Sequence, residues 1–316
     1  MSLFVEYMLN GVVLGALYAL IALGYTMVYG IIQLINFAHG EVFMVGAFGS
    51  LAVWSWGLQA DAKALVALPL MLIGGIAASV LIAVIMERFA YRPLRSAPRL
   101  APLITAIGVS ISLQELVRLA WPIRTAAGTL GHGAKSAQPY PKLISEKQLS
   151  VLGANVSVVE IVIVGVALAC MAGLILFVYR SRTGRAMQAT AQDPDTARLM
   201  GINVDRIIVT AFILGATLAG IAGVAQGLRY GIIDNRMGFI AGLKAFTAAV
   251  LGGIGNIGGA VLGGFFLGVV EALAVGYMPG KFGGGAWKDI WAFVVLILVL
   301  VLRPQGLLGE KVADRA

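Results

Sequence analysis

Long apolar stretches separated by short polar segments dominate the sequence. About eight of them have the length that can cross a bilayer as a helix, roughly 20 residues at about 1.5 Å per residue. They cover approximately residues 9–29, 42–56, 65–86, 102–120, 158–178, 207–228, 260–277 and 287–302. A further apolar stretch, residues 245–254, is too short to span alone. The pattern predicts an all-α integral membrane protein, a polytopic bundle of about eight transmembrane helices with broken or re-entrant segments.

The composition supports this class. The 316 residues are 59% hydrophobic and 12% charged, whereas soluble domains carry about 25% charged residues. The net charge of +8 would suit nucleic acid, but the basic residues lie in short segments beside the apolar stretches, as topology determination requires. We therefore expect a single transmembrane domain over residues 1–316, surrounded by membrane lipid, with no nucleic-acid partner.

The single cysteine and the first ten residues exclude two further kinds of feature. Cys170 is the only cysteine and lies inside an apolar stretch, so we expect neither a disulfide framework nor a metal site. Residues 1–10 lack a basic region and a small-residue cleavage site. We therefore expect no cleaved signal peptide, and the first span stays in the protein.

Arginines mark the segments expected to face the cytoplasm. They gather in residues 87–99, after the third span, and in residues 180–206, after the fifth. Because Arg-rich loops stay inside, segment 122–157 between them is expected to be an irregular extracytoplasmic loop. Counting spans places the N-terminus outside and the C-terminus inside the cell inner membrane. This count requires residues 245–254 to add a crossing, or another span not to cross fully.

Residues 180–206 are more elaborate than a connection between two spans requires. We expect a short helix over residues 185–192 and a second one with Asp193 as N-cap, Pro194 at its first position and Gly201 at its end. This arrangement suits docking into a groove on a soluble partner, and an ordinary interfacial amphipathic loop is the alternative. The candidate coupling residues are Arg185, Ala189, Asp193, Ala197, Leu199, Gly201 and Ile202.

Polar residues interrupt the apolar pattern within residues 30–49. Asn36, His39 and Glu41 stand at membrane depth, where polar groups are costly unless they face a cavity or the bundle interior. Asn36 is a candidate cap for a helix whose first turn holds His39, Gly40 and Glu41, which would make this a broken span lining the translocation pathway. A tight turn at the membrane interface is the alternative.

Glycines interrupt the pattern again over residues 251–264. Glycine at this density does not hold a regular helix, and paired broken segments in the two halves of a transporter indicate a central pathway. Gly253, Gly255 and Asn256 are therefore pathway candidates. Glu271, deep in an apolar run, is another. We expect no catalytic residue, since the sequence has no His-Glu-x-x-His motif and no paired catalytic aspartates within spans.

Taken together, these segments resemble the permease subunits of branched-chain amino acid ABC importers. The matching pieces are residues 10–41, 87–95, 103–114, 184–203, 242–268 and 296–309. They cover nearly the whole chain, whereas segment 121–157 departs from the family pattern, which puts the fit to a binding protein in doubt. The resemblance implies the ABC importer permease fold and favours the shorter of the two permease types. It implies translocation of branched-chain amino acids, with other neutral amino acids, urea or short amides as alternative substrates.

The resemblance also implies partners: a second permease subunit in a heterodimer, two ATPase subunits that dock on residues 180–206, and a soluble substrate-binding protein. The sequence has no phosphate-binding loop, since its one Gly-Lys pair is followed by Phe282. We therefore expect ATP and Mg²⁺ to be used by partner subunits, with no cofactor bound by this chain. A secondary transporter or channel is the alternative class, because Glu41 and Glu271 could supply a coupling-ion site, but it leaves residues 180–206 without a role.

Overall fold

The computed structural model describes residues 2–34, 36–58, 63–95, 97–98, 100–124, 130–132, 137–144, 147–151, 154–282, 284–285, 287–303 and 305–309. The longer helices are α1 (Ser2–Ile32), α2 (His39–Gly57), α3 (Ala64–Met86), α4 (Leu100–Ala120), α5 (Val158–Arg180), α8 (Val204–Tyr230), α9 (Met237–Gly252), α10 (Ile257–Tyr277) and α11 (Lys288–Leu302). Shorter helical turns are η1 (Glu87–Tyr91), η2 (Arg92–Leu94), α6 (Arg182–Gln192), α7 (Pro194–Leu199) and η3 (Gly280–Phe282).

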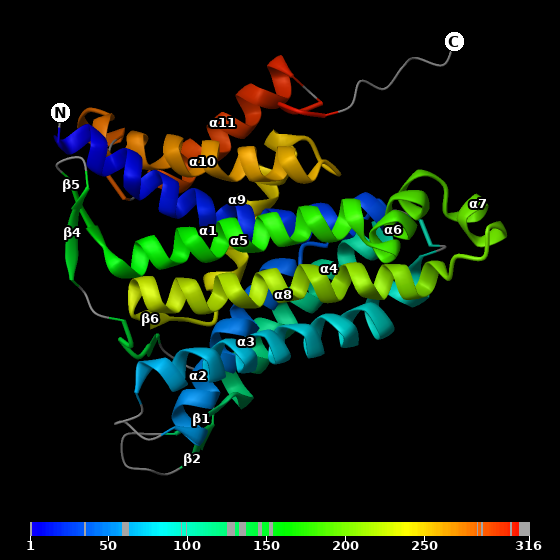
Figure 1. Cartoon of the computed structure of the whole chain (residues 1–316), viewed down its shortest axis with the longest axis horizontal. Helices are drawn as coiled ribbons and strands as arrows, with labels where there is room; N and C mark the ends of the chain where they lie inside the picture. The colour runs from blue at the N-terminus through cyan, green and yellow to red at the C-terminus, as the bar shows by residue number, and fades with distance from the viewer. Residues whose placement is uncertain are drawn as a thin grey trace.

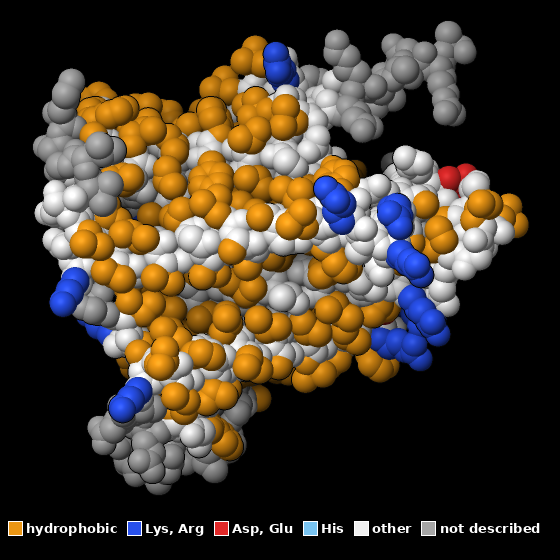
Figure 2. Space-filling model, viewed as in Figure 1, with side chains coloured by type: hydrophobic (Ala, Val, Ile, Leu, Met, Phe, Trp, Pro, Cys, Tyr) orange, Lys and Arg blue, Asp and Glu red, His pale blue; other side chains and the backbone are white. Residues whose placement is uncertain are grey.

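The predicted spans are helical in the structure. Among the residues that the structure describes, six helices are long and apolar enough to cross a membrane, at residues 3–32, 64–94, 100–120, 158–180, 204–230 and 257–277. The two other expected spans correspond to α2, with 19 residues, and α11, with 15. Hydrophobic side chains cover the visible surface between the two ends of the bundle, and Lys and Arg side chains gather near the ends (Figure 2). The chain is a multi-pass protein of the inner membrane.

Short strands occupy one end of the bundle, and α6 and α7 lie at the opposite end (Figure 1). We call these the strand end and the α6–α7 end. The strands are β1 (Pro122–Arg124), β2 (Leu130–His132), β3 (Gln138–Pro139), β4 (Gln148–Val151), β5 (Ala154–Ser157) and β6 (Ile232–Ile233). They pair antiparallel as β1–β2, β4–β5 and β3–β6.

This pairing corrects the expectation that segment 122–157 is irregular. Two of its strand pairs are local, and the third joins β3 to β6, which lies far along the chain between α8 and α9. The partner of β3 could not be recognised from a two-residue strand, because the pairing depends on where α8 ends. Backbone groups that would otherwise lack partners bind one another in these ladders.

The centre of the bundle is α1, which is largely buried although its mean hydropathy of 2.0 lies within the range of the more exposed spans α3, α4 and α5, from 1.6 to 3.0. Glycines let α1 and α10 approach closely and antiparallel. A Cβ at Gly15 would lie 2.6 Å from the Cα of Phe265, and one at Gly11 would lie 2.7 Å from the Cα of Val269. In lipid the hydrophobic effect does not drive helices together, so their association depends on the close van der Waals packing that small residues allow.

Helix α9 supplies the extra passage that the span count required. It follows β6 at the strand end, and its last turn lies near the opposite end, where the backbone N–H groups of Leu307 and Leu308 donate to the carbonyls of Leu251 and Gly252. Its 16 residues make it shorter than a full span, and it passes between the two ends at a steep angle to the neighbouring helices (Figure 1). The N-terminus of α1 and residues 305–309 consequently lie at opposite ends.

The crossing of α2, α3 and α8 provides a test of this packing. A methyl group at Gly46 would lie 2.5 Å from Ser79 Oγ and 2.7 Å from the Cα of Gly220. Overpacking of this kind costs about 1–3 kcal/mol, so Gly46→Ala should lower the midpoint of thermal unfolding in detergent. Gly108→Ala on α4 is the matched control, because a Cβ there meets no atom within 4 Å, and it should leave the midpoint unchanged or raise it. Equal midpoints for the two variants would contradict the packing.

Candidate translocation site and coupling surface

The chain between α1 and α2 leaves helical geometry inside the bundle. Gln33 adopts a left-handed φ of +52°, and helix resumes only at His39. The ring of His39 lies beside Gly215, eleven residues after the start of α8 at Val204. That is about 16 Å along a helix, or about half of a hydrocarbon core ~30 Å thick. The predicted break is therefore present, and α2 begins near mid-depth rather than at the interface.

Asn36 is buried at this break but does not cap α2, which corrects the predicted cap. The N-cap of α2 is Ala38, two residues later, and it makes no side-chain bond. Asn36 Oδ1 instead accepts a hydrogen bond of 2.6 Å from the Tyr91 hydroxyl, and its carbonyl accepts from the His39 N–H at 3.0 Å. Asn36 thus ties the break to the end of α3, where the π-helical turn η1 carries Tyr91.

His39 and Glu41 contact side chains on two other helices. The His39 ring packs edge-on against Tyr25 of α1, with centroids 4.8 Å apart. Glu41 Oε1 accepts hydrogen bonds from Ser110 Oγ at 2.9 Å and from Gln114 Nε2 at 2.8 Å, both on α4. Both side chains are buried, and they join α1, α2 and α4 around the break.

Gly40 brings the start of α2 against the start of α9. A Cβ at Gly40 would lie 2.8 Å from the Cα of Gly242, and one at Gly238 would lie 2.5 Å from Glu41 Oε2. Any side chain at these positions would push α9 away from the break. The predicted importance of Gly40 therefore has a steric basis in the close approach of two helices.

Residues 253–256 of the glycine-rich segment 251–264 form the turn between α9 and α10. Residues 257–264 are helical and belong to α10, so the expectation that this segment holds no regular helix is wrong for them. Gly253 and Gly255 have φ values of +103° and +93°, which side chains rarely adopt. Asn256 Oδ1 accepts from the Gly259 N–H at 2.9 Å, and its Nδ2 donates to the Leu308 carbonyl at 2.9 Å. Asn256 thus caps α10 and holds residues 305–309 in place, whereas Asn36 caps no helix.

Residues 180–206 fold as the sequence predicts, into two short helices. Asp193 caps α7 by accepting from the N–H groups of Asp195 and Thr196 at 2.9 and 3.1 Å. Hydrogen bonds from Thr196 hold the pKa of the Asp193 carboxyl below its usual value, so the cap is kept at neutral pH and weakens only as the pH falls through that lowered pKa. Gly201, with φ of +84°, ends α7 in a Schellman turn, since the Ile202 N–H donates to the Ala197 carbonyl at 3.0 Å.

The candidate coupling residues divide between the surface and the interior. Leu199 is 87% exposed and its neighbour Met200 is 79% exposed. Ala197, one of the candidate coupling residues, is only 3% exposed, so it faces the protein and does not lie on the surface that a partner could contact. Arg185, Asp193 and Gly201 are exposed, and Ala189 and Ile202 are half-buried. The surface that α7 presents is therefore an apolar tip of Leu199 and Met200.

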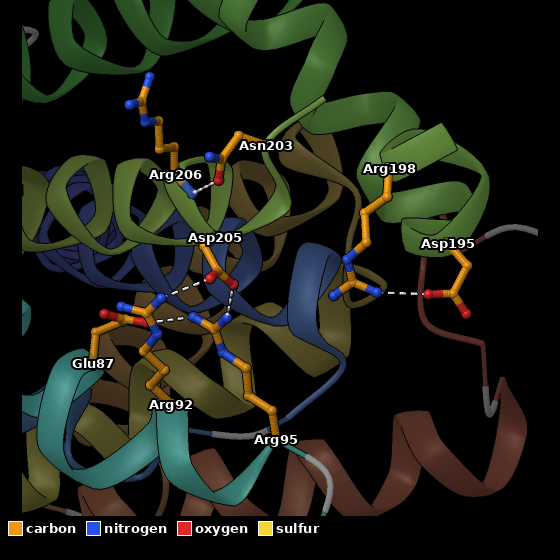
Figure 3. Close-up of polar contacts among 8 residues, drawn as sticks. All are labelled: Glu87, Arg92, Arg95, Asp195, Arg198, Asn203, Asp205 and Arg206. Carbon is orange, nitrogen blue, oxygen red and sulfur yellow. Dashed lines mark hydrogen bonds and ion pairs between the residues drawn. The ribbon is translucent and has the colours of Figure 1, made fainter. Parts of the chain in front are cut away.

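An ion-pair network joins the start of α8, directly after this loop, to the turn that follows α3 (Figure 3). Asp205 accepts from Arg92 Nη2 at 2.7 Å and from Arg95 Nη1 at 2.5 Å. Arg95 also pairs with the buried carboxylate of Glu87. The basic segment that set the predicted topology therefore also fixes the base of α8.

Glu271 lies in a buried cluster near the strand end. Its Oε1 lies 2.8 Å from Lys244 Nζ, and its Oε2 accepts from the Tyr18 hydroxyl at 2.9 Å. Lys244 Nζ also lies 2.5 Å from Asp289 Oδ1. Lys244 and Glu271 are almost fully buried, whereas the Asp289 side chain is 37% exposed.

This cluster borders a cavity of about 800 Å³ between α1, α9, α10 and α11. Residues of β5 and β6 also line the cavity, which places it at the strand end. Arg229, near the end of α8, contributes a further basic side chain to the wall. The cavity thus combines fixed charges of both signs with apolar side chains.

Four residues of these sites were not among the sequence candidates, and only one of them, Lys244, had a recognisable signal in the sequence. Lys244 is a single charge within an apolar helix, which was a usable signal. Arg229 and Asp289 stand near helix ends, where charged residues are ordinary. Tyr91 belongs to the Arg-rich segment 87–99, and nothing in its spacing points to Asn36, 55 residues earlier.

The sequence matches the family described as "Branched-chain amino acid transport system / permease component" over residues 7–300. The chain belongs to this family. It is therefore a transport subunit of an ABC system and not an enzyme, and further components of such a system are separate chains. The arrangement of polytopic helices with broken segments is the permease fold that the resemblance implied.

Full-length relatives agree. The chain is 44% identical over 317 residues to the "High-affinity branched-chain amino acid transport system permease protein BraD" of Pseudomonas aeruginosa, covering 99% of this chain and 98% of the relative. It is 42% identical over 324 residues to the "High-affinity branched-chain amino acid transport system permease protein LivH" of Escherichia coli (strain K12), covering 99% and 97%. A "Probable branched-chain amino acid transport permease protein LivH" of Methanocaldococcus jannaschii is 26% identical over 309 residues, covering 95% and 91%.

The bond between Asn36 and Tyr91 can be tested by a double-mutant cycle. Asn36→Leu and Tyr91→Phe should each lower stability by about 1–3 kcal/mol, because each leaves a buried polar atom without its partner. The double variant should lose about 1 kcal/mol less than the sum of the two, since no orphan remains. Thermal unfolding of each purified variant, together with uptake, measures this. Strictly additive losses would show that the bond does not form.

Proposed function

We propose that this chain translocates branched-chain amino acids inward as a permease subunit driven by separate ATPase subunits. The substrate class is taken from what the relatives' names say of those proteins, and uptake of other neutral amino acids or of urea is the alternative. The observation that carries the coupling half of the proposal is the exposed apolar tip of α7. Leu199 and Met200 project from a helix that is capped at both ends. The caps fix the position of this apolar tip, which suits insertion into a groove on an ATPase subunit.

The proposed assembly contains a second, different permease subunit, two ATPase subunits and a soluble substrate-binding protein. The ATPase subunits use ATP and Mg²⁺, and this chain binds no cofactor. The substrate path runs from the cavity at the strand end, past Glu271, towards the break at Asn36, His39, Gly40 and Glu41. It leaves near the α9–α10 turn with Gly253, Gly255 and Asn256, which lies at the end where the ATPase subunits dock.

The proposed orientation places the strand end outside and the α6–α7 end in the cytoplasm. Its support is the gathering of Arg side chains in η2 and α6, next to the ends of α3 and α5, because such loops are retained inside. A reporter that is active only in the cytoplasm should therefore be active when fused after Arg95 or Ser181 and inactive when inserted at Pro139. Activity at Pro139, or its absence at Ser181, would invert the orientation and remove α7 from the ATPase subunits.

The docking surface is best tested at Leu199. Gly201 is a poor choice because its φ of +84° makes any substitution strain the turn itself. Leu199→Asp should weaken co-purification with the ATPase by more than about tenfold, because burial of a leucine contributes about 1.5–3 kcal/mol and a charge must be desolvated in its place. ATP-driven uptake of labelled leucine in proteoliposomes should fall with it.

Two controls keep this experiment specific. Leu199→Met retains an apolar tip of similar size, and Asp195→Asn removes an exposed charge from the same helix. Both should co-purify with the ATPase and transport leucine as the wild type does. Normal uptake by Leu199→Asp would exclude α7 as the docking helix. Uptake of labelled urea but not of leucine by the wild type would replace the proposed substrate.

A further inference from the structure

Arg229 holds an unused donor in the wall of the cavity at the strand end. Its side chain is only 9% exposed, and its Nη1 is buried without a hydrogen-bond partner in the part of the chain that the structure describes. The other terminal nitrogen, Nη2, is occupied, since it donates to Asn10 Oδ1 and lies 3.5 Å from Glu160 Oε1. The guanidinium therefore has one edge fixed by the protein and one nitrogen left over.

A buried donor of this kind is unusual, because leaving it unpaired costs the full desolvation of the group. A charged guanidinium N–H donates a strong, charge-assisted hydrogen bond to a carboxylate oxygen. Contacts with Asn10, Glu160 and the Tyr230 ring, whose centroid lies 5.4 Å from the guanidinium carbon, hold the side chain in one orientation. A preorganised and incompletely paired arginine is a ready receptor for a ligand carboxylate.

We propose that this cavity is an amino-acid-binding site of the permease itself, in which Arg229 binds the α-carboxylate of the substrate. The identity of the amino acid rests on the proposed function, but the recognition of a carboxylate does not.

The rest of the cavity fits a zwitterion better than a simple anion. The cluster of Lys244, Glu271 and Asp289 has one more negative than positive charge, and Asp289 is its exposed member, so the cluster presents negative charge to an ammonium group. Leu14, Leu17 and Ile21 of α1 supply apolar wall, which suits an aliphatic side chain. An ordinary anion would gain nothing from Asp289.

The site can be tested without relying on transport or on the binding protein. Cys170 is the only cysteine in the chain, so a Cys170→Ala background can carry one reporter thiol at Ile240, which lines the cavity and is 42% exposed. In the transporter complex without binding protein, leucine at millimolar concentration should slow modification of Ile240→Cys by a water-soluble thiol reagent. Leucinamide, which lacks the carboxylate, should protect about tenfold less well, the loss expected for one charge-assisted hydrogen bond.

Variants of Arg229 then assign the effect to one residue. Arg229→Gln should abolish protection by leucine while the rate without ligand stays unchanged, and Arg229→Lys should restore part of it. Arg236→Gln is the matched control, because it removes another positive charge from the same cavity and should leave protection intact. Equal protection by leucine and leucinamide in the Arg229-containing protein would overturn the proposal, even if Arg229→Gln fails to fold. Equal loss in Arg236→Gln would overturn it too.

The experiments distinguish failure of the proposed function from failure of the proposed carboxylate site. If the assembled wild type does not take up leucine but leucine still protects the thiol, the proposed function fails and the carboxylate site stands. If leucine is transported and does not protect, the site is wrong while the proposed function stands.

Discussion

The requirement that polar groups at membrane depth find partners inside the protein governs this structure. In lipid, an unpaired backbone or side-chain group costs far more than at a wet surface. The non-helical segment before α2 is therefore enclosed by other helices, and Asn36 within it bonds to Tyr91. Glu41, in the first turn of α2, bonds to Ser110 and Gln114 of α4. Enclosure in turn demands close approach of the surrounding helices, which is why glycines occupy both the α1–α10 seam and the Gly46–Gly220 crossing.

The sequence predicted the parts of the fold that follow from local rules. Span positions follow from apolar length, and the two helices of residues 180–206 follow from Asp193, Pro194 and Gly201, whose capping roles depend only on near neighbours. The parts it could not predict depend on packing. Asparagine is a common helix N-cap, but the side chain of Asn36 bonds to Tyr91 instead. The π-helical turn after α3 brings the Tyr91 hydroxyl within 2.6 Å of it. The β3–β6 pair likewise joins segments whose register is set only when α8 is in place.

The same distinction applies to the candidate site. Glu271 was recognisable because a carboxylate within an apolar run is conspicuous, and Lys244 carries the same signal on α9. Asp289 and Arg229 were not recognisable, because a charge near a helix end is ordinary until the helices show which cavity it lines. A pathway without fixed charges would neither attract nor repel a substrate that has no net charge. The cavity instead has both signs of charge, and so can suit a neutral substrate by complementing its two ends.

The structure also distributes rigidity unevenly along the proposed path. At the base of α8, Asp205 is bound by two arginines, one of which also pairs with Glu87. Around the α1–α2 break, by contrast, Tyr25 Oη, Thr26 Oγ1, Asn36 Nδ2 and His39 Nε2 are buried without hydrogen-bond partners among the residues the structure describes. A rearrangement that gives these atoms new partners recovers free energy, whereas one at the base of α8 must first break ion pairs. The break is therefore where this bundle can change shape at the lowest cost, and it lies between the cavity and the end that carries α7.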